Sequence, residues 1–329
     1  MTSLQFSVVD VFSKTPYKGN PLAVVNDVEG LLSDTQMKLI ARQFNLSETT
    51  FFSRPELPGA TYKLRSFLPD GREVFGVGHN ILGAWWFLAQ GGFLDFTKAG
   101  AGEEFVFSQE LGGSVTPVKI RRFNETAGSQ PPDFYVSITQ ATPKSHAQHP
   151  DPASLAASIG LRVDDVGFST LKPRVMSTAT TYHLLVPVAS IAALERATVQ
   201  RDTLLQQLRL VDERAYGIYL FAKEEVEPDK DVYRARFFSP GMSSEDPATG
   251  SAAGPLAALL HQEGYLDLVE GHARIEVWQG HQVGRRCGIR VELEARDGSG
   301  VEDVVVDIAG TAVRISEGVI AVPEASTVF

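Results

Sequence analysis

The sequence predicts an α+β fold made of two pseudo-symmetric domains, each a mostly antiparallel sheet wrapped around a central buried helix. Three observations carry this prediction. Strand-like segments outnumber helical ones, a strand–helix unit occurs twice along the 329 residues, and the helix of each copy is almost wholly apolar. A chain of this length suits two domains of about 150 residues each.

Short runs rich in Val, Ile, Phe and Tyr recur along the whole chain and are typical of strands. These strand-like segments do not alternate regularly with helices, so a doubly wound α/β fold is disfavoured. The predicted strands are Leu4–Val9, Leu22–Val25, Thr50–Ser53, Tyr62–Phe67, Phe105–Phe107, Phe134–Ile138, Tyr182–Val186, Ile218–Phe221, Val232–Phe238, Arg274–Val277, Gly288–Leu293, Val304–Ile308 and Val313–Ile315.

Fewer segments have the periodicity of helices. The predicted helices are Ser33–Gln43, Asn80–Gln90, Pro152–Ile159, Ser190–Ala197, Asp202–Leu208 and Ser251–Gln262.

The repeat joins two of these helices to the strands before them. YKLRSFLP at 62–69 matches YRARFFSP at 233–240, 171 positions later. GHNILGAWWFLAQGGFLD at 78–95 matches GSAAGPLAALLHQEGYLD at 250–267, 172 positions later. Each copy has a strand ending in Arg-x-Phe-x-Pro, a polar loop, a Gly and an apolar helix. A helix that is apolar all round is buried, so each copy supplies one central helix.

The repeat also predicts the domain organisation. We expect residues 1–125 to form an N-terminal domain, joined by the C-terminal residues 318–329, and residues 126–317 to form a C-terminal domain. Segments 131–132, 142–152 and 172–173 are polar or Pro-containing and are expected to be exposed connectors. Two related halves that meet along a line would create a cleft, which is where ligands commonly bind.

Composition excludes several classes of function. The formal charge is −10 and no long run of Lys and Arg occurs, so nucleic-acid binding is not expected. The apolar runs are too short to span a membrane, and the N-terminus lacks a signal-peptide pattern. Cys287 is the single cysteine, which excludes an internal disulfide, gives no structural zinc spacing and is compatible with a cytoplasmic protein.

The starts of the two central helices are the first candidate binding site. A buried helix leaves free N–H groups and a partial positive charge at its N-terminus, which suits an anion such as a substrate carboxylate. Gly78 with Asn80, and Gly250 with Ser251, are therefore candidate substrate-binding residues. The alternative is that Asn80 and Ser251 only cap their helices.

His79 occupies the repeat position of Ser251 and can exchange protons near neutral pH, although a lone His is more often structural. The two close glycines of GVGHNILG, residues 76–83, do not complete GxGxxG, and no P-loop motif occurs. Nucleotide binding is therefore disfavoured, and His79 is a candidate proton-transfer residue.

Two acids are further candidates. Glu48 directly precedes an apolar strand, where burial would raise its pKa toward a range useful for acid/base chemistry; the alternative is a surface acid at a strand end. Asp246 precedes a Pro and lies before the first helical turn, so capping does not readily explain it. Its neighbour Glu245 is interpreted as a solvated or capping charge. Asn20 is either a turn former or a group that holds a polar atom of the substrate.

Together these residues resemble the PhzF-like family of phenazine-biosynthesis-type isomerases, which share the diaminopimelate epimerase fold. The matching segments are DVFSKTPYKGNPLAVV, LSETTFF, RSFLPDGREVFGVGHNILGA, RFFSPGMSSEDPATGSAAG and QGHQVGR. The resemblance covers nearly the whole chain, and its GNPLAVV and EDPATGSA segments are specific.

The resemblance implies an active site in the interdomain cleft, a homodimer, and neither metal nor organic cofactor. It makes Glu48 the acid/base group, with His79, Asp246 and Ser251 as further site residues and Asn20 as a substrate contact. Asn80, the bulky Trp85-Trp86 and the Arg286-Cys287 pair depart from the common family pattern and put the particular substrate in doubt.

Related epimerases and racemases use two cysteines, one at each central helix. This chain has Val77 and the EDPATGS loop there, and its single cysteine lies elsewhere, so a two-thiol racemase is not expected.

These observations lead to one hypothesis and its rivals. We expect a cytoplasmic, cofactor-independent isomerase that moves a proton within a small carboxylate-bearing metabolite, with Glu48, His79 and Asp246 as catalytic residues. The alternatives are an epimerase or lyase on the same scaffold, or a non-catalytic small-molecule-binding protein. No nucleic-acid or membrane partner is expected.

Overall fold

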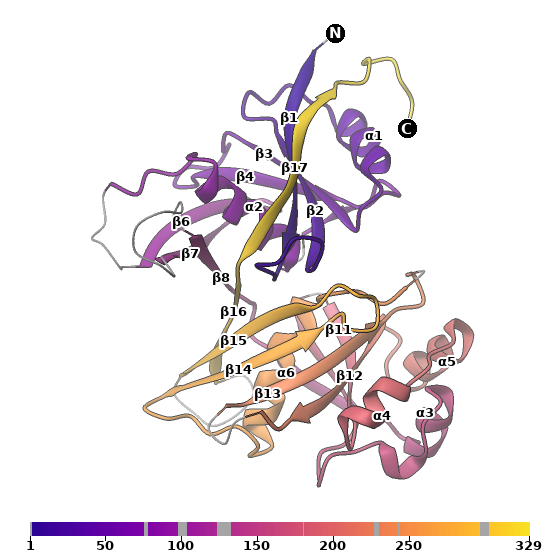
Figure 1. Cartoon of the computed structure of the whole chain (residues 1–329). Coiled ribbons are helices and arrows are strands. Elements are labelled where there is room, and N and C mark those ends of the chain that lie inside the picture. Colours follow the sequence, from indigo (N-terminus) through magenta and orange to yellow (C-terminus); the bar gives the residue numbers. More distant parts are fainter. Residues whose placement is uncertain are drawn as a thin grey trace. The chain divides into compact units, whose positions relative to one another are not determined.

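A computed structural model describes residues 2–75, 78–97, 104–123, 133–179, 181–226, 230–242, 244–296 and 303–329. The chain divides into two compact units (Figure 1). The first holds Met1–Ile138 and Ala309–Phe329, and the second holds Thr139–Ile308. The domain boundaries predicted from the sequence lie instead between residues 125 and 126 and between residues 317 and 318. Two strands that pair with each other, at residues 114–123 and 133–139, carry the first unit beyond residue 125.

The first unit is a mixed sheet with a helix on each face. Neighbouring strands pair in the order β17, β1, β2, β3, β4, β6, β7, β8, and the β2–β3 and β4–β6 pairs are parallel. Its elements are β1 (Ser3–Val11), β2 (Asn20–Asn26), α1 (Asp34–Phe44), β3 (Glu48–Ser53), β4 (Tyr62–Phe67), β5 (Glu73–Val74), α2 (His79–Gln90), β6 (Glu104–Leu111), β7 (Ser114–Phe123), β8 (Asp133–Thr139) and β17 (Ala312–Ala321).

The second unit repeats this order of strands. Its strands pair as β9, β10, β11, β12, β13, β14, β15, and the β11–β12 and β13–β14 pairs are parallel. Its elements are β9 (Lys144–Gln148), α3 (Pro152–Ser158), the short helix η1 (Val163–Asp165), β10 (Arg174–Thr178), β11 (Thr181–Pro187), α4 (Ile191–Arg196), α5 (Arg201–Val211), β12 (Gly217–Glu224), β13 (Val232–Phe238), α6 (Gly250–Gln262), β14 (His272–Gln279), β15 (Cys287–Ala295) and β16 (Val304–Gly310).

The predicted pseudo-symmetric α+β fold is therefore confirmed. The five strands β1 to β4 and β6 pair antiparallel, parallel, antiparallel and parallel, and so do β10 to β14. The helix that follows the fourth strand is α2 in one unit and α6 in the other, as the repeat predicts.

Both central helices are buried, as their composition predicts. All of α2 from His79 to Ala89 is buried, and in α6 so are Gly250 and the residues from Ala252 to Leu260. Gly83 lets α2 approach the sheet, because a Cβ there would lie 2.5 Å from the Val11 side chain. In the first unit α2 packs on β1, β2, β3 and β17.

The opposite face of each sheet is covered by more amphipathic helices. In the first unit α1 begins with a capping box between Ser33 and Gln36 and packs Met37 and Ile40 on the sheet. In the second unit α3, α4 and α5 gather on one face of the sheet, away from α6 (Figure 1). This arrangement makes each sheet the middle of three layers.

One expected connector is structured. Segment 142–152 contains β9, which pairs antiparallel with β10, and β10 itself follows the predicted connector at 172–173. The strand KSHAQ is polar and largely exposed, so its sequence lacks the apolar alternation by which strands were recognised. The predicted connector at 131–132 lies outside the described residues.

Candidate active site

Glu48 is the first residue of β3, directly after the loop that ends α1. The C-cap residue of α1 is Asn45, which adopts the left-handed conformation that Asn tolerates, with φ of 51°. Side chains alternate along a strand, and Phe52 contacts Phe87 of α2 at a ring distance of 6.0 Å. Glu48 lies four residues before Phe52, so its side chain also points to the face of the sheet that carries α2.

The structure brings Glu48 and His79 together. Nε2 of His79, the first residue of α2, lies 3.2 Å from Oε2 of Glu48. The side chains are 8% and 21% exposed, respectively. Burial of Glu48 raises the pKa of its carboxyl to about 7, because the charged form loses solvation. An acid with this pKa can both take and return a proton near neutral pH.

Asn20 is fully buried at the start of β2. The preceding Gly19 has φ of +83°, and a Cβ there would lie 2.6 Å from the carbonyl oxygen of Val11, so this position requires glycine. Strands β2 and β3 are parallel, with Leu22 opposite Glu48. Asn20 therefore lies at the same end of the sheet as Glu48.

The start of α2 carries no side-chain cap. Gly78 is the N-cap residue, and Asn80 is already the second helical residue, so the capping interpretation of Asn80 is wrong. Asn80 is 5% exposed, and its Nδ2 has no hydrogen-bond partner among the residues that the structure describes. A buried amide donor of this kind is available to a ligand.

In the second unit, hydrogen bonds hold both the backbone and the side chain of Asp246, and its Oδ1 accepts from the N–H of Ala248 at 3.4 Å. Its N–H donates to the carbonyl of Phe237 at 3.3 Å, and its carbonyl accepts from Nε2 of Gln279 at 2.7 Å. Its carboxylate accepts from Oγ1 of Thr249 at 2.7 Å. The N-cap of α6 is Thr249, so Asp246 is not the helix cap.

Ser251 is the second residue of α6 and does not cap it either. Its Oγ lies 3.0 Å from Nε2 of His183 on β11. Burial lowers the pKa of His183 to about 3, so its ring is neutral near pH 7 and a weak base. The carbonyl of Gly250, one residue before Ser251, accepts from Nε2 of Gln140 at 3.0 Å. These contacts fix the first turn of α6.

The interpretation of Glu245 as a solvated or capping charge is wrong. Its side chain is 11% exposed and forms an ion pair with Arg236, whose side chain is 7% exposed. A buried carboxylate needs such a partner, and the partner lies on the preceding strand β13.

Sequence reasoning missed two supporting residues, His183 and Gln279. His183 could have been found as a lone polar residue inside the apolar strand β11. Gln279 belongs to the QGHQVGR segment, which was recognised only as a family pattern. Oε1 of Gln279 also accepts from the N–H of Thr249 at 3.1 Å, so Gln279 is hydrogen-bonded to both ends of the loop 246–249.

Across the described ranges, no group of three or more His, Cys, Asp or Glu side chains could hold a metal ion. Within the same ranges, no helix has both the length and the apolar character needed to cross a membrane. The prediction that the two sets of site residues face one another across a cleft stays a prediction.

Comparison with known proteins identifies the family of this chain. Residues 9–318 match the family described as phenazine biosynthesis-like protein. The chain is 32% identical to an uncharacterized isomerase of Mesorhizobium japonicum over 97% of this chain and 99% of that protein. It is 29% identical to trans-2,3-dihydro-3-hydroxyanthranilate isomerase of Pseudomonas aeruginosa, over 95% of this chain and 98% of that enzyme.

Solved structures that resemble this chain include members of the same family. A phenazine biosynthesis protein of the PhzF family from Bacillus anthracis superposes with a TM-score of 0.81 at 25% identity, covering 98% of this chain and 100% of that one. A probable proline racemase from Agrobacterium radiobacter shares the fold alone, with a TM-score of 0.60 at 13% identity over 98% of this chain and 94% of that one.

The fold class is thus the one that PhzF-family proteins share with proline racemase-like enzymes. Within that class, the chain belongs to the phenazine biosynthesis-like family, and it is an isomerase.

Proposed function

We propose that the protein is a cofactor-independent isomerase that moves a proton within a small carboxylate-bearing metabolite, with Glu48 as the acid/base group. The observation that carries the proposal is the contact of Glu48 with His79 at the start of a buried helix, 3.2 Å between Oε2 and Nε2. A single carboxylate that takes a proton from one carbon and returns it to another needs no second base.

The pKa of Glu48 supports both halves of this proton transfer. With a pKa of about 7, the carboxyl is a base in its ionised form and an acid once it has taken the proton. His79 lies close enough to donate a hydrogen bond to the carboxylate or to relay its proton. We therefore expect activity to rise with pH through an apparent pKa near 7.

The remaining site residues are proposed to bind the substrate. Asn80 offers a buried amide donor beside the uncapped start of α2, where the helix dipole favours an anion. Gly78 and Asn20 belong to the same end of the first unit. Gly250 and Ser251 supply the equivalent helix start in the second unit, which has no side-chain cap either. Asp246 is proposed to orient polar groups or assist the proton path.

The first substrate to test is trans-2,3-dihydro-3-hydroxyanthranilate, the compound named in the enzyme of Pseudomonas aeruginosa that is 29% identical to this chain. It carries the carboxylate that the helix starts are proposed to bind. A panel of other small unsaturated carboxylates should be tested beside it.

The test compares the wild type with Glu48→Gln in D2O, following deuterium uptake and product formation by NMR. Glu48→Gln should lower turnover roughly 10²–10⁴-fold, the usual contribution of general acid/base catalysis, with the fold intact by circular dichroism. Glu110→Gln is the control, because Glu110 is a buried acid of the same unit that binds backbone N–H groups and Lys63 instead.

Full turnover by Glu48→Gln would reject Glu48 as the acid/base group. Deuterium that appears only at a stereocentre, without a change of connectivity, would replace isomerisation by epimerisation.

We also propose that the protein is a homodimer, as its family resemblance implies. Light scattering coupled to gel filtration checks this, because a monomer of 35.8 kDa and a dimer differ twofold in mass.

A further inference from the structure

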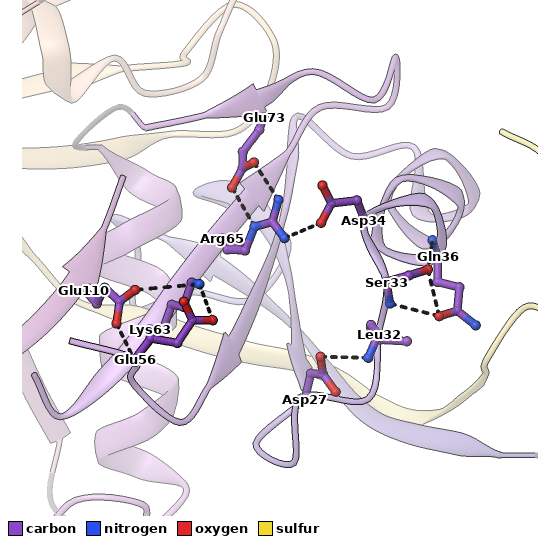
Figure 2. A network of polar contacts seen from close by, with 10 residues as sticks. All are labelled: Asp27, Leu32, Ser33, Asp34, Gln36, Glu56, Lys63, Arg65, Glu73 and Glu110. Atoms are coloured by element: carbon purple, nitrogen blue, oxygen red, sulfur yellow. Dashed lines mark hydrogen bonds and ion pairs between the residues drawn. The ribbon is translucent and has the colours of Figure 1, made fainter. Parts of the chain in front are cut away.

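An arginine and a glutamate form the same ion pair before the central helix of each unit. In the first unit, Nε and Nη2 of Arg65 donate to the two carboxylate oxygens of Glu73 at 2.8 and 2.7 Å (Figure 2). In the second unit, Nε of Arg236 donates to Oε2 of Glu245 at 3.1 Å, and its Nη2 donates to Oε1. Both pairs are bidentate, the strongest arrangement of these two groups.

The two pairs occupy equivalent positions of the repeat. Arg65 and Arg236 are the arginines of the matched strands β4 and β13, 171 positions apart, and the glutamates are 172 positions apart. Each guanidinium also lies over the ring two residues further along its strand, 5.1 Å from the Phe67 centroid and 4.9 Å from that of Phe238. A contact retained in both copies of a diverged repeat points to a shared task.

In the second unit the pair is anchored and buried. Nη1 of Arg236 donates to the carbonyls of Leu194 and Ala197 at the end of α4, at 2.9 and 2.7 Å. The guanidinium is therefore fixed by backbone on one side and holds Glu245 on the other. Only 7% and 11% of the two side chains are exposed, so little water competes for the ion pair.

Glu245 directly precedes Asp246. The backbone of Asp246 is held by Phe237 and Gln279, and its carboxylate by Thr249. The hydrogen bond to Phe237 holds the peptide group between Glu245 and Asp246 to β13, but it does not fix the Glu245 side chain. The ion pair adds a second tie on this side, because it joins the Glu245 side chain to Arg236 on the same strand.

We infer that Arg236 and Glu245 are positioning residues, which hold the Asp246 carboxylate in place for the reaction through the loop 245–249. The inference rests on the proposed function for the role of Asp246 itself. Arg65 and Glu73 form the equivalent support before His79 in the first unit. A displacement of about 1 Å at a reacting group can lower turnover by about 10²-fold, so loosening this support acts on turnover more than on substrate binding.

The test uses Glu245→Gln, which removes the charge and one of the two acceptors while keeping the size of the side chain. Glu224→Gln is the matched control. The carboxylate of Glu224 pairs with Nη2 of Arg234 at 2.5 Å, and Arg234 lies on β13, the strand that also carries Arg236. The Glu224 side chain is 22% exposed, and Glu224 is remote from Asp246 in sequence. Both variants are compared at a temperature at which circular dichroism shows them fully folded.

Two readouts separate positioning from general stability. Amide hydrogen exchange of residues 244–249 should become at least about 10-fold faster in Glu245→Gln and stay within about 2-fold of the wild type in Glu224→Gln. With trans-2,3-dihydro-3-hydroxyanthranilate as the probe, kcat should fall about 10- to 100-fold in Glu245→Gln while KM changes less than about 3-fold. Glu245→Asp, which keeps the charge, should recover part of kcat.

Equal exchange in residues 244–249 for the two variants overturns the inference, whether or not the probe is turned over. So does faster exchange with an unchanged kcat. The outcome is separable from that of the proposed function, because an active Glu48→Gln enzyme rejects the acid/base assignment and leaves the exchange result standing.

Discussion

The two units share an order of strands, a central helix and an ion pair before that helix, but the strand that begins with Glu48 in the first unit begins with Gly217 in the second. Parallel pairing sets Glu48 opposite Leu22 in the first unit and Gly217 opposite His183 in the second. The antiparallel partners agree, because Thr49 lies opposite Phe67 and Ile218 opposite Phe238, a pair matched by the repeat. Gly217 therefore holds the position of Glu48.

The second unit has no room for a side chain there. A Cβ on Gly217 would lie 2.2 Å from the ring of Phe237. The residue of the first unit that matches Phe237 in the repeat is Ser66, whose small side chain bonds to Thr50 at 2.8 Å. One position on the neighbouring strand, Ser66 or Phe237, thus decides whether the first residue of this strand can carry an acidic side chain.

The largest expected difference between the units is the cost of losing the arginine. Arg236→Ala leaves Glu245 buried without its partner and should lower the free energy of unfolding by about 3–5 kcal/mol. Arg65→Ala should cost only about 1 kcal/mol. Arg65, Glu73 and Asp34 are 22%, 22% and 67% exposed, so water replaces the lost contacts (Figure 2). Urea unfolding followed by circular dichroism measures both, and equal costs would show that burial does not distinguish the two pairs.

The next effect concerns Glu48, whose position is held by a glycine, Gly217, in the second unit. Its pKa is raised from 4.5 to about 7 in the folded protein, so the folded state holds the proton more tightly than the unfolded state. The wild type therefore loses about 3 kcal/mol of stability as pH rises from 4.5 to 7, and the loss is complete above pH 7.

Glu48→Gln removes this titration. Its stability should equal that of the wild type near pH 4 and exceed it by about 3 kcal/mol above pH 7. Denaturation curves at several pH values measure the difference, and a constant difference across this range would mean that the pKa of Glu48 is not raised.

The smallest effect probes the space at Gly217. Gly217→Ala should cost about 1–3 kcal/mol, because its methyl group would overlap the Phe237 ring. Gly241→Ala is the control, since the nearest atom to a Cβ there is 3.9 Å away. Melting temperatures of the two variants compare them directly. A Gly217→Ala protein as stable as the control would show that Phe237 moves aside and that the second unit could accept a side chain.

Prediction from sequence succeeded where the signal is local. Helices were predicted over 80–90 and 251–262 and are observed over 79–90 and 250–262. Their apolar composition and flanking glycines lie within a few residues of each boundary, so no distant contact is needed to recognise them. Glu48 was likewise expected directly before an apolar strand, and it is the first residue of β3.

Prediction failed where a residue's environment comes from elsewhere in the chain. Glu245 resembles a surface acid until Arg236 and the end of α4 are placed around it. His183 is hydrogen-bonded to Ser251 because β11 packs against α6. Strand β9 is polar and is recognised only by its pairing with β10.

The sequence by itself determined the repeat, the two buried helices, the absence of a second thiol and the set of acids available for proton transfer. Tertiary structure alone decided that Glu48 meets His79, that Glu245 is a buried partner of Arg236, and that Phe237 closes the position equivalent to Glu48. The reason is physical. Residue type and periodicity can be read from the sequence. Desolvation, pairing and steric exclusion depend on which residues from distant parts of the chain are in contact.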